Sequence, residues 1–416
     1  MTANPTSAPA RGARRQCREL VIEITRRYAA QMAQPGLIVI GSGPAGVSAA
    51  EAFRAHCRDV PVRILTADPA LPYARPPLSK DYLRGETGDV ALHPAQWYDD
   101  RAIELIGDLR VDRIDVQSRT VIAGNNRFDY RAVVLACGAT PAALPVPGGE
   151  SALRLRSLTD ARRLRQAAID ADAAVVIGAG FIGCEAATSL ARQGVAVTLV
   201  APQAVPQQKR LGAEAGERLR RLVTDAGVRY VGEVSVEEIH DHAVALTNGV
   251  TIDCDLILAA TGVRPRTELA ETAGLDIENS RIVVGADMQT SAADIYAAGD
   301  VTLAHNSAAR RALAVEHWQD AVDQGAIAGA GAANADAKWA TVPGFWTTIG
   351  QTTLKYHAWG DGYQRSRLLE RGDGFTVWYE ADGSAVGVLT CNADDDYELG
   401  GRPIEAGEPA PVPMAR

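Results

Sequence analysis

Two glycine-rich turns are the parts of this sequence best suited to chemistry. Each follows a short apolar run and opens an alanine-rich stretch, so each predicts a strand, a tight turn and a helix. In such a turn the first glycine makes the bend, the second lets the backbone approach a pyrophosphate, and the third lets helix and strand pack closely. The two turns therefore predict two dinucleotide sites. Their glycines are Gly41, Gly43 and Gly46 in GSGPAG, and Gly178, Gly180 and Gly183 in GAGFIG.

Two dinucleotide sites in one chain indicate a tightly held flavin and an exchanging nicotinamide coenzyme, because hydride transfer needs the two rings in contact. In each unit an acidic residue after the second strand is expected to bind ribose hydroxyls. Asp68 takes that place in the first unit, whereas Ala201 takes it in the second. No charge at position 201 would repel the 2′-phosphate of NADPH. Lys209 and Arg210 follow, and either reach that phosphate or face solvent.

Three charged residues are candidates for the reaction itself. Lys80 follows the apolar, proline-rich loop PYARPPLS, where a cation beside the flavin N5/O4 edge would stabilise reduced, anionic flavin; a solvated lysine at a helix start is the alternative. Asp300 follows Gly299 at a strand end, where a carboxylate accepts hydrogen bonds from ribityl hydroxyls or caps a helix. Glu185 lies in the first turn of the second helix, and would orient the nicotinamide amide or complement the helix dipole.

The segments around these residues alternate buried strands and helices. LIVI (37–40) precedes the first glycine turn and AAVVI (173–177) the second, so each opens a β-α-β unit of a parallel sheet. After Trp339, short apolar runs alternate with glycine turns, which predicts a small antiparallel sheet ending near Leu399. The fold class is therefore α/β, with two nested Rossmann-like dinucleotide-binding domains and a small C-terminal α+β domain.

Two similar buried strands mark the crossings between these domains. AVVLACGATP (132–141) and DLILAATGVRP (255–265) each end in Gly and Pro. A long helix is expected from about Arg310 to Ala333. We expect a poorly ordered extension at 1–35 with a short amphipathic helix around 19–32, of which residues 1–31 are dispensable. The expected domains are an FAD-binding domain at 36–145 and 262–335, an NAD(P)-binding domain at 146–261 and a C-terminal reductase domain at 336–405, followed by a disordered tail at 406–416.

Composition excludes several classes of function. Of 416 residues, 47% are hydrophobic and 22% charged, which is ordinary for a soluble globular protein. The 5% aromatic content and the net charge of −9 argue against nucleic acid and anionic membranes as partners, and the chain has no transmembrane run. Six cysteines without a CxxC pair argue against a zinc ribbon or disulfide scaffold and favour a reducing cytoplasm. His240 and His242 lack a third ligand, so a surface turn is expected there and no metal site.

The motifs together resemble a known family. PYARPPLSKDYL (72–83) is similar to the signature loop of the FAD-dependent, pyridine-nucleotide ferredoxin reductases that supply electrons to oxygenases and cytochromes P450, within the glutathione-reductase-like flavoproteins. GSGPAG and GAGFIGCEAA match the family's FAD and coenzyme fingerprints. SAADIYAAGDV (291–301) matches its second FAD motif, and RALAVEHWQDAVDQG (311–325) resembles the helix after that motif. The resemblance covers about residues 36–400.

The resemblance implies roles for individual residues. Lys80 would lie beside the flavin ring, Arg75 near the FAD phosphates, and Asp300 at the ribityl chain. Trp318 would lie along the flavin, or pack in the core. Lys80 and Glu185 are the catalytic candidates. The implied cofactor-binding residues are Gly41, Ser42, Gly43, Pro44, Ala45, Gly46, Asp68, Arg75, Lys80, Ala136, Gly138, Gly178, Gly180, Phe181, Ile182, Gly183, Glu185, Gly262, Gly299, Asp300, Glu316, His317 and Trp318.

Three positions depart from the family pattern. Cys137 replaces the Thr of the ATG-x-x-P turn, and with Cys184 it is expected to be a small core residue. PGFWTTIGQTTLKYHAWG (343–360) differs from the usual PxFWSDQ pattern of the acceptor-facing region. Ala201 stands where NADH-dependent members generally carry an acid, so we expect weak discrimination between coenzymes, with NADH modestly favoured.

The expected function is electron transfer from NAD(P)H through FAD to a small iron–sulfur ferredoxin. Two alternatives remain on the same scaffold: a two-electron reductase of a small molecule such as a quinone or monodehydroascorbate, and a redox-sensing flavoprotein that binds a partner when reduced. The protein is expected to be a cytoplasmic monomer or homodimer.

Overall fold

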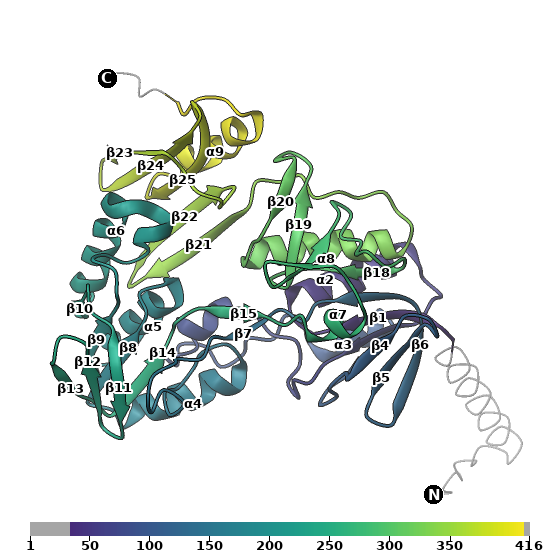
Figure 1. Ribbon diagram of the computed structural model, residues 1–416, viewed down its shortest axis with the longest axis horizontal. Coiled ribbons are helices and arrows are strands. Elements are labelled where there is room, and N and C mark those ends of the chain that lie inside the picture. Colours follow the sequence, from purple (N-terminus) through teal and green to yellow (C-terminus); the bar gives the residue numbers. More distant parts are fainter. Residues whose placement is uncertain (1–33, 412–416) are drawn as a thin grey trace, which may run out of the picture.

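The computed structural model describes residues 34–411 and arranges them around three main sheets (Figure 1). One unit lies at the right of the view, a second at the lower left, and an antiparallel sheet lies above the second. The expected N-terminal extension, apart from its last two residues, and the last five residues of the expected tail lie outside the described residues.

The first unit takes its elements from two stretches of the chain. Its sheet has the order β3-β2-β1-β6-β5-β4, and β18 pairs with β6. β1 pairs in parallel with both β2 and β6, so the first glycine turn leaves the carboxyl end of a central strand. These elements are β1 (Gly36–Ile40), α2 (Pro44–His56), β2 (Val62–Leu65), η1 (Pro76–Ser79), α3 (Ala95–Asp100), β3 (Ile103–Ile106), β4 (Arg113–Asp115), β5 (Thr120–Ala123), β6 (Asn126–Leu135), β18 (Ile295–Ala297) and α8 (Trp318–Ala332).

Helices α2 and α8 pack against each other beside this sheet (Figure 1). Glycines on α8 face the backbone of α2: a Cβ on Gly325 would lie 2.2 Å from the carbonyl oxygen of Ala45, and one on Gly329 would lie 2.1 Å from that of Ala49. Neither contact leaves room for a side chain. This close packing fixes the N-terminal end of α8 next to the first glycine turn.

The second unit repeats the plan on a smaller scale. Its sheet has the order β10-β9-β8-β14 and is parallel throughout. Helix α4 begins at a capping box in which Ser157 and Asp160 bond each other's backbone N–H groups. The elements are α4 (Leu158–Ile169), β8 (Ala173–Ile177), α5 (Phe181–Arg192), β9 (Ala196–Val200), α6 (Gln208–Asp225), β10 (Arg229–Val231) and β14 (Leu256–Ala259), with a small sheet of β11 (Val236–His240), β12 (Ala243–Leu246) and β13 (Thr251–Asp253).

The two crossings between the units lie side by side. The short strands β7 (Ala139–Pro141) and β15 (Val263–Pro265) follow the two similar buried strands and pair antiparallel with each other. The chain therefore leaves the first unit and returns to it through one two-stranded connection, at the centre of Figure 1.

The expected helix from Arg310 to Ala333 is shorter than the sequence suggested. The segment before it forms β20 (Arg311–Leu313), and α8 begins only at Trp318. β20 closes a sheet of β16 (Ile277–Glu278), β17 (Arg281–Val284) and β19 (Thr302–Asn306), near the short helix α7 (Glu268–Thr272). Leu313 and Val315 are buried while their neighbours are exposed, an alternation typical of a strand. The prediction overlooked that alternation.

The C-terminal part forms a five-stranded antiparallel sheet in the order β21-β22-β25-β24-β23, as expected. A helix, α9, follows and covers β25 and β22. The elements are β21 (Gly344–Ile349), β22 (Thr352–Ala358), β23 (Arg365–Arg371), β24 (Gly374–Ala381), β25 (Ser384–Cys391) and α9 (Asp394–Ala406).

The expectation of a disordered tail is wrong for residues up to 411. The carbonyl oxygen of Glu408 accepts a 2.7 Å hydrogen bond from the backbone N–H of Ala385, and that of Gly407 accepts one from the Ser384 hydroxyl. Ala410 is buried against the core. The segment is polar and proline-rich, yet it finds partners at the edge of the sheet, which composition alone does not reveal.

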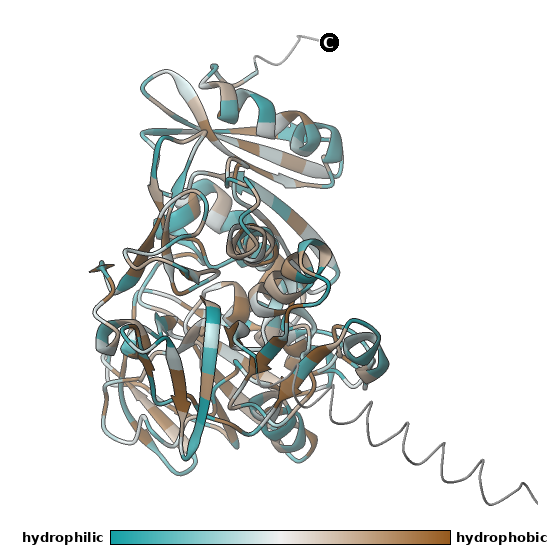
Figure 2. Cartoon of the chain, turned by 90° about the vertical axis from the view of Figure 1, so that its right-hand side faces the viewer, coloured by the Kyte–Doolittle hydropathy of each residue, from teal (hydrophilic) through white to brown (hydrophobic). Residues whose placement is uncertain are grey.

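Over the described chain, hydrophobic residues gather in the strands and hydrophilic residues in the surrounding loops (Figure 2).

Candidate active site

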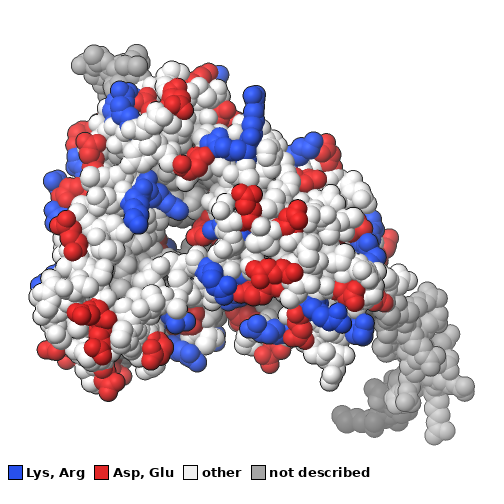
Figure 3. All heavy atoms as spheres, viewed as in Figure 1, with Lys and Arg blue, Asp and Glu red and all other residues white. Residues whose placement is uncertain are grey.

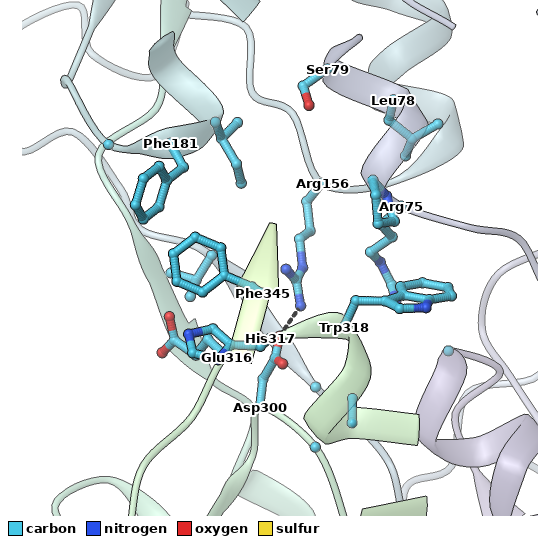
Figure 4. A pocket seen from close by; sticks show the side chains of 18 of the residues that line it. Arg75, Leu78, Ser79, Arg156, Phe181, Asp300, Glu316, His317, Trp318 and Phe345 are labelled. Atoms are coloured by element: carbon cyan, nitrogen blue, oxygen red, sulfur yellow. Dashed lines mark hydrogen bonds and ion pairs between the residues drawn. The ribbon is translucent and has the colours of Figure 1, made fainter. Parts of the chain in front are cut away.

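A cavity of about 430 Å³ lies where the three units meet. Figure 3 shows the molecule hollowed at this junction, and Figure 4 shows the side chains around the cavity. Both glycine turns contribute to its wall, together with the loop before Lys80, the N-terminal end of α8 and strand β21. The predicted site residues in its lining are Gly43, Pro44, Ala45, Arg75, Lys80, Ala136, Gly138, Gly180, Phe181, Ile182, Glu185, Gly262, Gly299, Asp300, Glu316, His317 and Trp318.

The remaining predicted glycines lie behind the cavity and shape the two turns. Gly41 and Gly178 have φ values of 114° and 105°, which L side chains rarely adopt. A Cβ on Gly46 would lie 2.0 Å from the carbonyl oxygen of Gly41, and one on Gly183 would lie 1.9 Å from that of Gly178. Each helix therefore starts as close to its strand as a bare backbone permits.

Two further residues that were predicted to bind cofactor, Asp68 and Ser42, form hydrogen bonds outside the cavity lining. Asp68 accepts hydrogen bonds from the Tyr73 hydroxyl, at 2.7 Å, and from the backbone N–H of Ala70, at 3.1 Å. Ser42 donates to the hydroxyl of Thr66. Neither lines the cavity. The ribose-binding role of Asp68 stays a prediction.

A cluster of arginines faces the first glycine turn. A Cβ on Gly43 would lie 2.9 Å from Nη1 of Arg75, so this guanidinium stands opposite the bare backbone of the turn. Burial of Arg75 lowers its pKa, and the nearby charges of Arg156 and Arg266 lower it further. Arg156 is paired with Asp300 (Figure 4). Cations thus outnumber carboxylates here.

The cluster fits the pyrophosphate of a dinucleotide. The Nε of Arg75 is buried and has no hydrogen-bond partner among the described residues. Leaving a buried charged donor unpaired is costly, so the position calls for an anion. The N-terminal end of α2, which begins at Pro44, adds its free backbone N–H groups on the same side.

Glu185 is a buried carboxylate that joins all three units. Its Oε2 lies 2.8 Å from the Nζ of Lys80 and accepts a 2.5 Å hydrogen bond from Ser79. Its Oε1 accepts a 2.6 Å hydrogen bond from the hydroxyl of Thr347 on β21. The side chains of Lys80 and Glu185 are only 15% and 7% exposed, so the pair is largely shielded from water. The two predicted catalytic residues are therefore one hydrogen-bonded ion pair.

The N-terminal end of α8 supplies another part of the wall. Glu316 is paired with Arg281, and His317 is the N-cap residue of the helix. The Nδ1 of His317 lies 3.1 Å from Oδ2 of Asp320. The ring of Phe345 lies 4.6 Å from the His317 ring, beside it in Figure 4.

The residues of the site that the sequence prediction missed include Ser79, Arg156, Phe345 and Thr347. Arg156 lies in LRLRSL, a stretch to which the sequence prediction gave no role. Phe345 and Thr347 lie in PGFWTTIGQ, which was recognised as divergent but given no role. Phe345 packs edge-on against Phe181 at 4.8 Å and links β21 to the second glycine turn.

The cysteines in and near the cavity are suited to packing. Cys137 lines the cavity, and its burial raises the pKa of the thiol to about 12. Cys184 is completely buried, and its pKa is likewise raised to about 12. Both stay protonated at neutral pH and are poor nucleophiles. Within residues 34–411 no disulfide forms and no cluster of His, Cys, Asp or Glu could hold a metal ion.

A second hollow marks the end of β9, where the coenzyme ribose is expected. Ala201 itself is only 1% exposed and lies behind this hollow, with its N–H bonded to the carbonyl oxygen of Val231. The walls carry one cation and one carboxylate. They are formed by Pro202, Gln203, Ala204, Gln208, Lys209 and Glu233.

Comparison with known proteins decides the family. Residues 35–325 match the model of the pyridine nucleotide-disulphide oxidoreductases. The chain belongs to that family. It is 32% identical over 400 residues to the ferredoxin–NAD(+) reductase component of the anthranilate 1,2-dioxygenase system of Burkholderia cepacia, covering 92% of this chain and 98% of the relative. It is also 32% identical over 331 residues to rubredoxin-NAD(+) reductase of Pseudomonas putida, covering 77% of this chain and 85% of that one.

Solved structures of this oxidoreductase family agree with that assignment. The putidaredoxin reductase in a covalent complex with putidaredoxin superposes with a TM-score of 0.85, at 28% identity and over 90% of this chain and 94% of the other. The ferredoxin reductase for the CYP199A2 system of Rhodopseudomonas palustris gives a TM-score of 0.84 at 29% identity, over 89% and 95%. The expected α/β fold with its C-terminal domain is confirmed. None of the helices within residues 34–411 has the length and apolar character needed to span a bilayer.

Proposed function

We propose that this oxidoreductase passes electrons from NAD(P)H, through FAD, to a small iron–sulfur ferredoxin that serves an oxygenase or a cytochrome P450. The observation that carries the proposal is the cavity in which both glycine turns converge, because hydride transfer between two dinucleotides needs their rings in contact. The relatives named as ferredoxin and rubredoxin reductases support the choice of acceptor.

The first turn and its arginines would hold FAD. Gly43 and Arg75 lie next to each other in the cavity lining, where both could contact the pyrophosphate, and Asp300 would accept hydrogen bonds from the ribityl chain. When bound, FAD supplies the ability to take up a hydride and to release electrons one at a time. The wild-type protein is then yellow, and Asp300→Ala weakens FAD binding; a colourless wild type that takes up no FAD would contradict this assignment.

The Lys80–Glu185 pair would organise the reacting end of the cavity. Lys80 supplies a cation in a shielded place, where it stabilises negative charge more strongly than in water. Ser79 and Thr347 hold the Glu185 carboxylate in one orientation, so that a remaining lone pair can position the carboxamide of the coenzyme. The rings of Phe181 and Phe345 exclude water on that side.

The domain boundaries that this function implies follow the sheets. We place an FAD-binding domain at 36–145 and 262–335, an NAD(P)-binding domain at 146–261, both Rossmann-like, and a reductase domain from 336 onward.

Five free thiols among the described residues support a cytoplasmic location. The protein would act as a monomer or homodimer.

The preference between NADH and NADPH should depend on Ala201, the residue that follows β9. With Ala201 in place of a carboxylate, and Lys209 at the edge of the adjacent hollow, we propose that NADPH is accepted and NADH only modestly favoured. A charge-assisted hydrogen bond contributes about 1.5–3 kcal/mol, so Ala201→Glu should shift kcat/KM toward NADH by roughly ten- to a hundred-fold. Ala201→Gln, which has similar bulk without the charge, is the matched control. Equal shifts in both variants would assign the effect to bulk.

The test of the function has two stages. Anaerobic mixing with NADH or NADPH should bleach the flavin absorbance, and a ferredoxin with cytochrome c as reporter should then restore it over many turnovers. Rapid reduction of a quinone with none of ferredoxin would favour the small-molecule reductase. A reduced protein that reoxidises slowly with every acceptor would favour a redox sensor. Absence of bleaching with either coenzyme would refute the proposal.

A further inference from the structure

His317, which lines the cavity, forms a hydrogen-bonded pair with Asp320, and the proposed function assigns no role to this pair. The side chain of His317 is 12% exposed and that of Asp320 is 5% exposed, and their atoms Nδ1 and Oδ2 are 3.1 Å apart. Oδ2 of Asp320 also accepts a hydrogen bond from the backbone N–H of Gly344. The ring of Phe345 shields the pair on one side.

This arrangement selects one tautomer of the imidazole. A carboxylate can only accept hydrogen bonds, so Nδ1 of His317 must carry the hydrogen that joins it to Asp320. The other nitrogen, Nε2, then has a free lone pair, and no described residue hydrogen-bonds to it. His317 lines the cavity, and its Nε2 is therefore a proton acceptor there, backed by a carboxylate that would stabilise the imidazolium.

The positively charged residues of the cavity lining cannot accept a proton. Arg75, Arg156 and Arg210 line it, and arginine stays protonated in proteins. The Nζ of Lys80 lies 2.8 Å from Oε2 of Glu185, in an ion pair.

The acidic and thiol side chains of the lining are occupied as well. Glu185 accepts from Lys80 and two hydroxyls, Asp300 is paired with Arg156, and Glu316 is paired with Arg281. Cys137 is a thiol whose pKa, raised to about 12 by burial, keeps its own proton in place. Each carboxylate of the cavity lining is therefore held in an ion pair with a lysine or an arginine, whereas the imidazole of His317 is not.

The reaction proposed above produces a proton in this cavity. When the C4–H bond of NAD(P)H breaks, its electron pair leaves to two one-electron acceptors, and its hydrogen remains as one H⁺. We propose that Nε2 of His317 takes up this proton, forming an N–H bond, and that Asp320 stabilises the resulting imidazolium until the proton passes to solvent. The inference rests on the proposed function, since a two-electron acceptor such as a quinone would carry the hydrogen away and release no proton from NAD(P)H.

Groups from neighbouring elements surround the pair and bear on its charge. Asp323 lies one turn on in α8, and the charge of Asp320 contributes to the raised pKa that burial gives Asp323. His357 on β22 and Tyr397 on α9 lie on the other side and also sense the charge of Asp320. Protonation of His317 compensates a carboxylate that no lysine or arginine pairs among the described residues.

The first test measures the tautomer, without turnover. In holoenzyme labelled with ¹⁵N-histidine, the His317 signals should show a protonated Nδ1 and an unprotonated Nε2 at neutral pH. Asp320→Asn should mix the two tautomers. A wild type with Nε2 protonated and Nδ1 bare would overturn the inference, because the base would then point away from the cavity.

The second test separates the steps of turnover, with ferricyanide as a one-electron acceptor that needs no protein partner. In His317→Ala, flavin reoxidation by ferricyanide should fall about a hundred-fold or more relative to bleaching by NADH, since a positioned acid–base group contributes about 10²–10⁴-fold. Added imidazole should restore much of the rate. His317→Gln guards against a loss of folding, and His305→Gln, an exposed histidine on β19, is the matched control.

The outcomes distinguish this inference from the proposed function. If reoxidation in both His317 variants keeps pace with bleaching, or if imidazole restores nothing, His317 is not the proton acceptor. If wild type is not bleached by either coenzyme, the proposed function itself fails, while the tautomer measurement still reports on the pair.

Discussion

The hydroxyl of Thr347 donates a 2.6 Å hydrogen bond to the carboxylate of Glu185, across the boundary between the C-terminal sheet and the second unit. Thr347 is 2% exposed, so this bond is made away from water. The C-terminal sheet thus determines how the carboxylate presents itself to Lys80 and to the cavity. Its contribution to the site is direct, although the glycine motifs lie elsewhere in the chain.

Removing this hydroxyl should weaken coenzyme use. Thr347→Val keeps the shape of the side chain but leaves Oε1 of Glu185 buried without its donor. Hydrogen bonds to charged groups contribute about 1.5–3 kcal/mol, so kcat/KM for NAD(P)H should fall roughly ten-fold or more, while Thr347→Ser should retain most of it.

Thr348→Val is the control for this substitution. Thr348 lies on the opposite face of β21, where its hydroxyl is 3.0 Å from that of Thr353. Steady-state measurement of kcat/KM for NAD(P)H in the three variants, at one ionic strength, tests whether the Thr347 hydroxyl is required. A similar loss in Thr347→Val and Thr348→Val would indicate a general effect on the sheet.

A substitution in one glycine turn should abolish binding of one dinucleotide without affecting the other turn. In Gly46→Ala the new methyl group meets the carbonyl oxygen of Gly41 at 2.0 Å, so the first turn must open and FAD should be lost. In Gly183→Ala the clash is with Gly178 at 1.9 Å, and the protein should stay yellow while NAD(P)H no longer bleaches it. Gly88→Ala, which meets nothing within 4 Å, should resemble wild type. Flavin content and anaerobic bleaching measure both effects.

The elements predicted best are those specified by neighbouring residues. The turns that begin at Gly41 and Gly178 need only their own glycines and the flanking strands. Arg156 and Thr347 depend on residues more than a hundred positions away, Asp300 and Glu185 respectively. No local pattern identifies such contacts. They follow from how the sheets are brought together.

The predicted start of the helix near Arg310 was wrong because a short strand precedes that helix. Arg311–Leu313 has residues acceptable in either structure, and pairing with β19 decides in favour of a strand. The same applies to the segment after Ala406, whose composition suggests disorder but whose backbone bonds to β25. Tertiary partners outweighed local preference in both places.

The packed C-terminal segment can be tested by truncation. A chain ending at Ala406 loses the backbone hydrogen bond from Ala385, the bond from Ser384 and the buried side chain of Ala410. Each hydrogen bond contributes about 1 kcal/mol, so thermal unfolding should shift down by several degrees. A chain ending at Pro411 should melt like the full-length protein. Equal melting of both truncated chains would show that the segment adds no stability.

His357 should make stability depend on pH. Its ring stacks on Tyr397 at 4.2 Å between centroids, and its Nδ1 is buried without a hydrogen-bond partner among the described residues. Burial lowers the pKa of His357 below its value in the unfolded chain, about 6.5. Below that pH the unfolded state binds the extra proton more readily, so the free energy of unfolding falls as the pH falls.

The loss should begin near pH 6.5 and continue down to the lowered pKa of the folded state, with a slope of at most about 1.4 kcal/mol per pH unit for this one proton. Above pH 7.5 His357 is neutral in both states and contributes no pH dependence. Urea unfolding of wild type and His357→Gln at pH 7.5, 6.5 and 5.5 measures the difference. The variant should be less pH-sensitive, whereas His242→Gln, an exposed histidine at the β11–β12 turn, should keep the wild-type slope. An unchanged slope in His357→Gln would place the titrating group elsewhere, because it would mean that the folded and the unfolded chain bind protons equally at position 357.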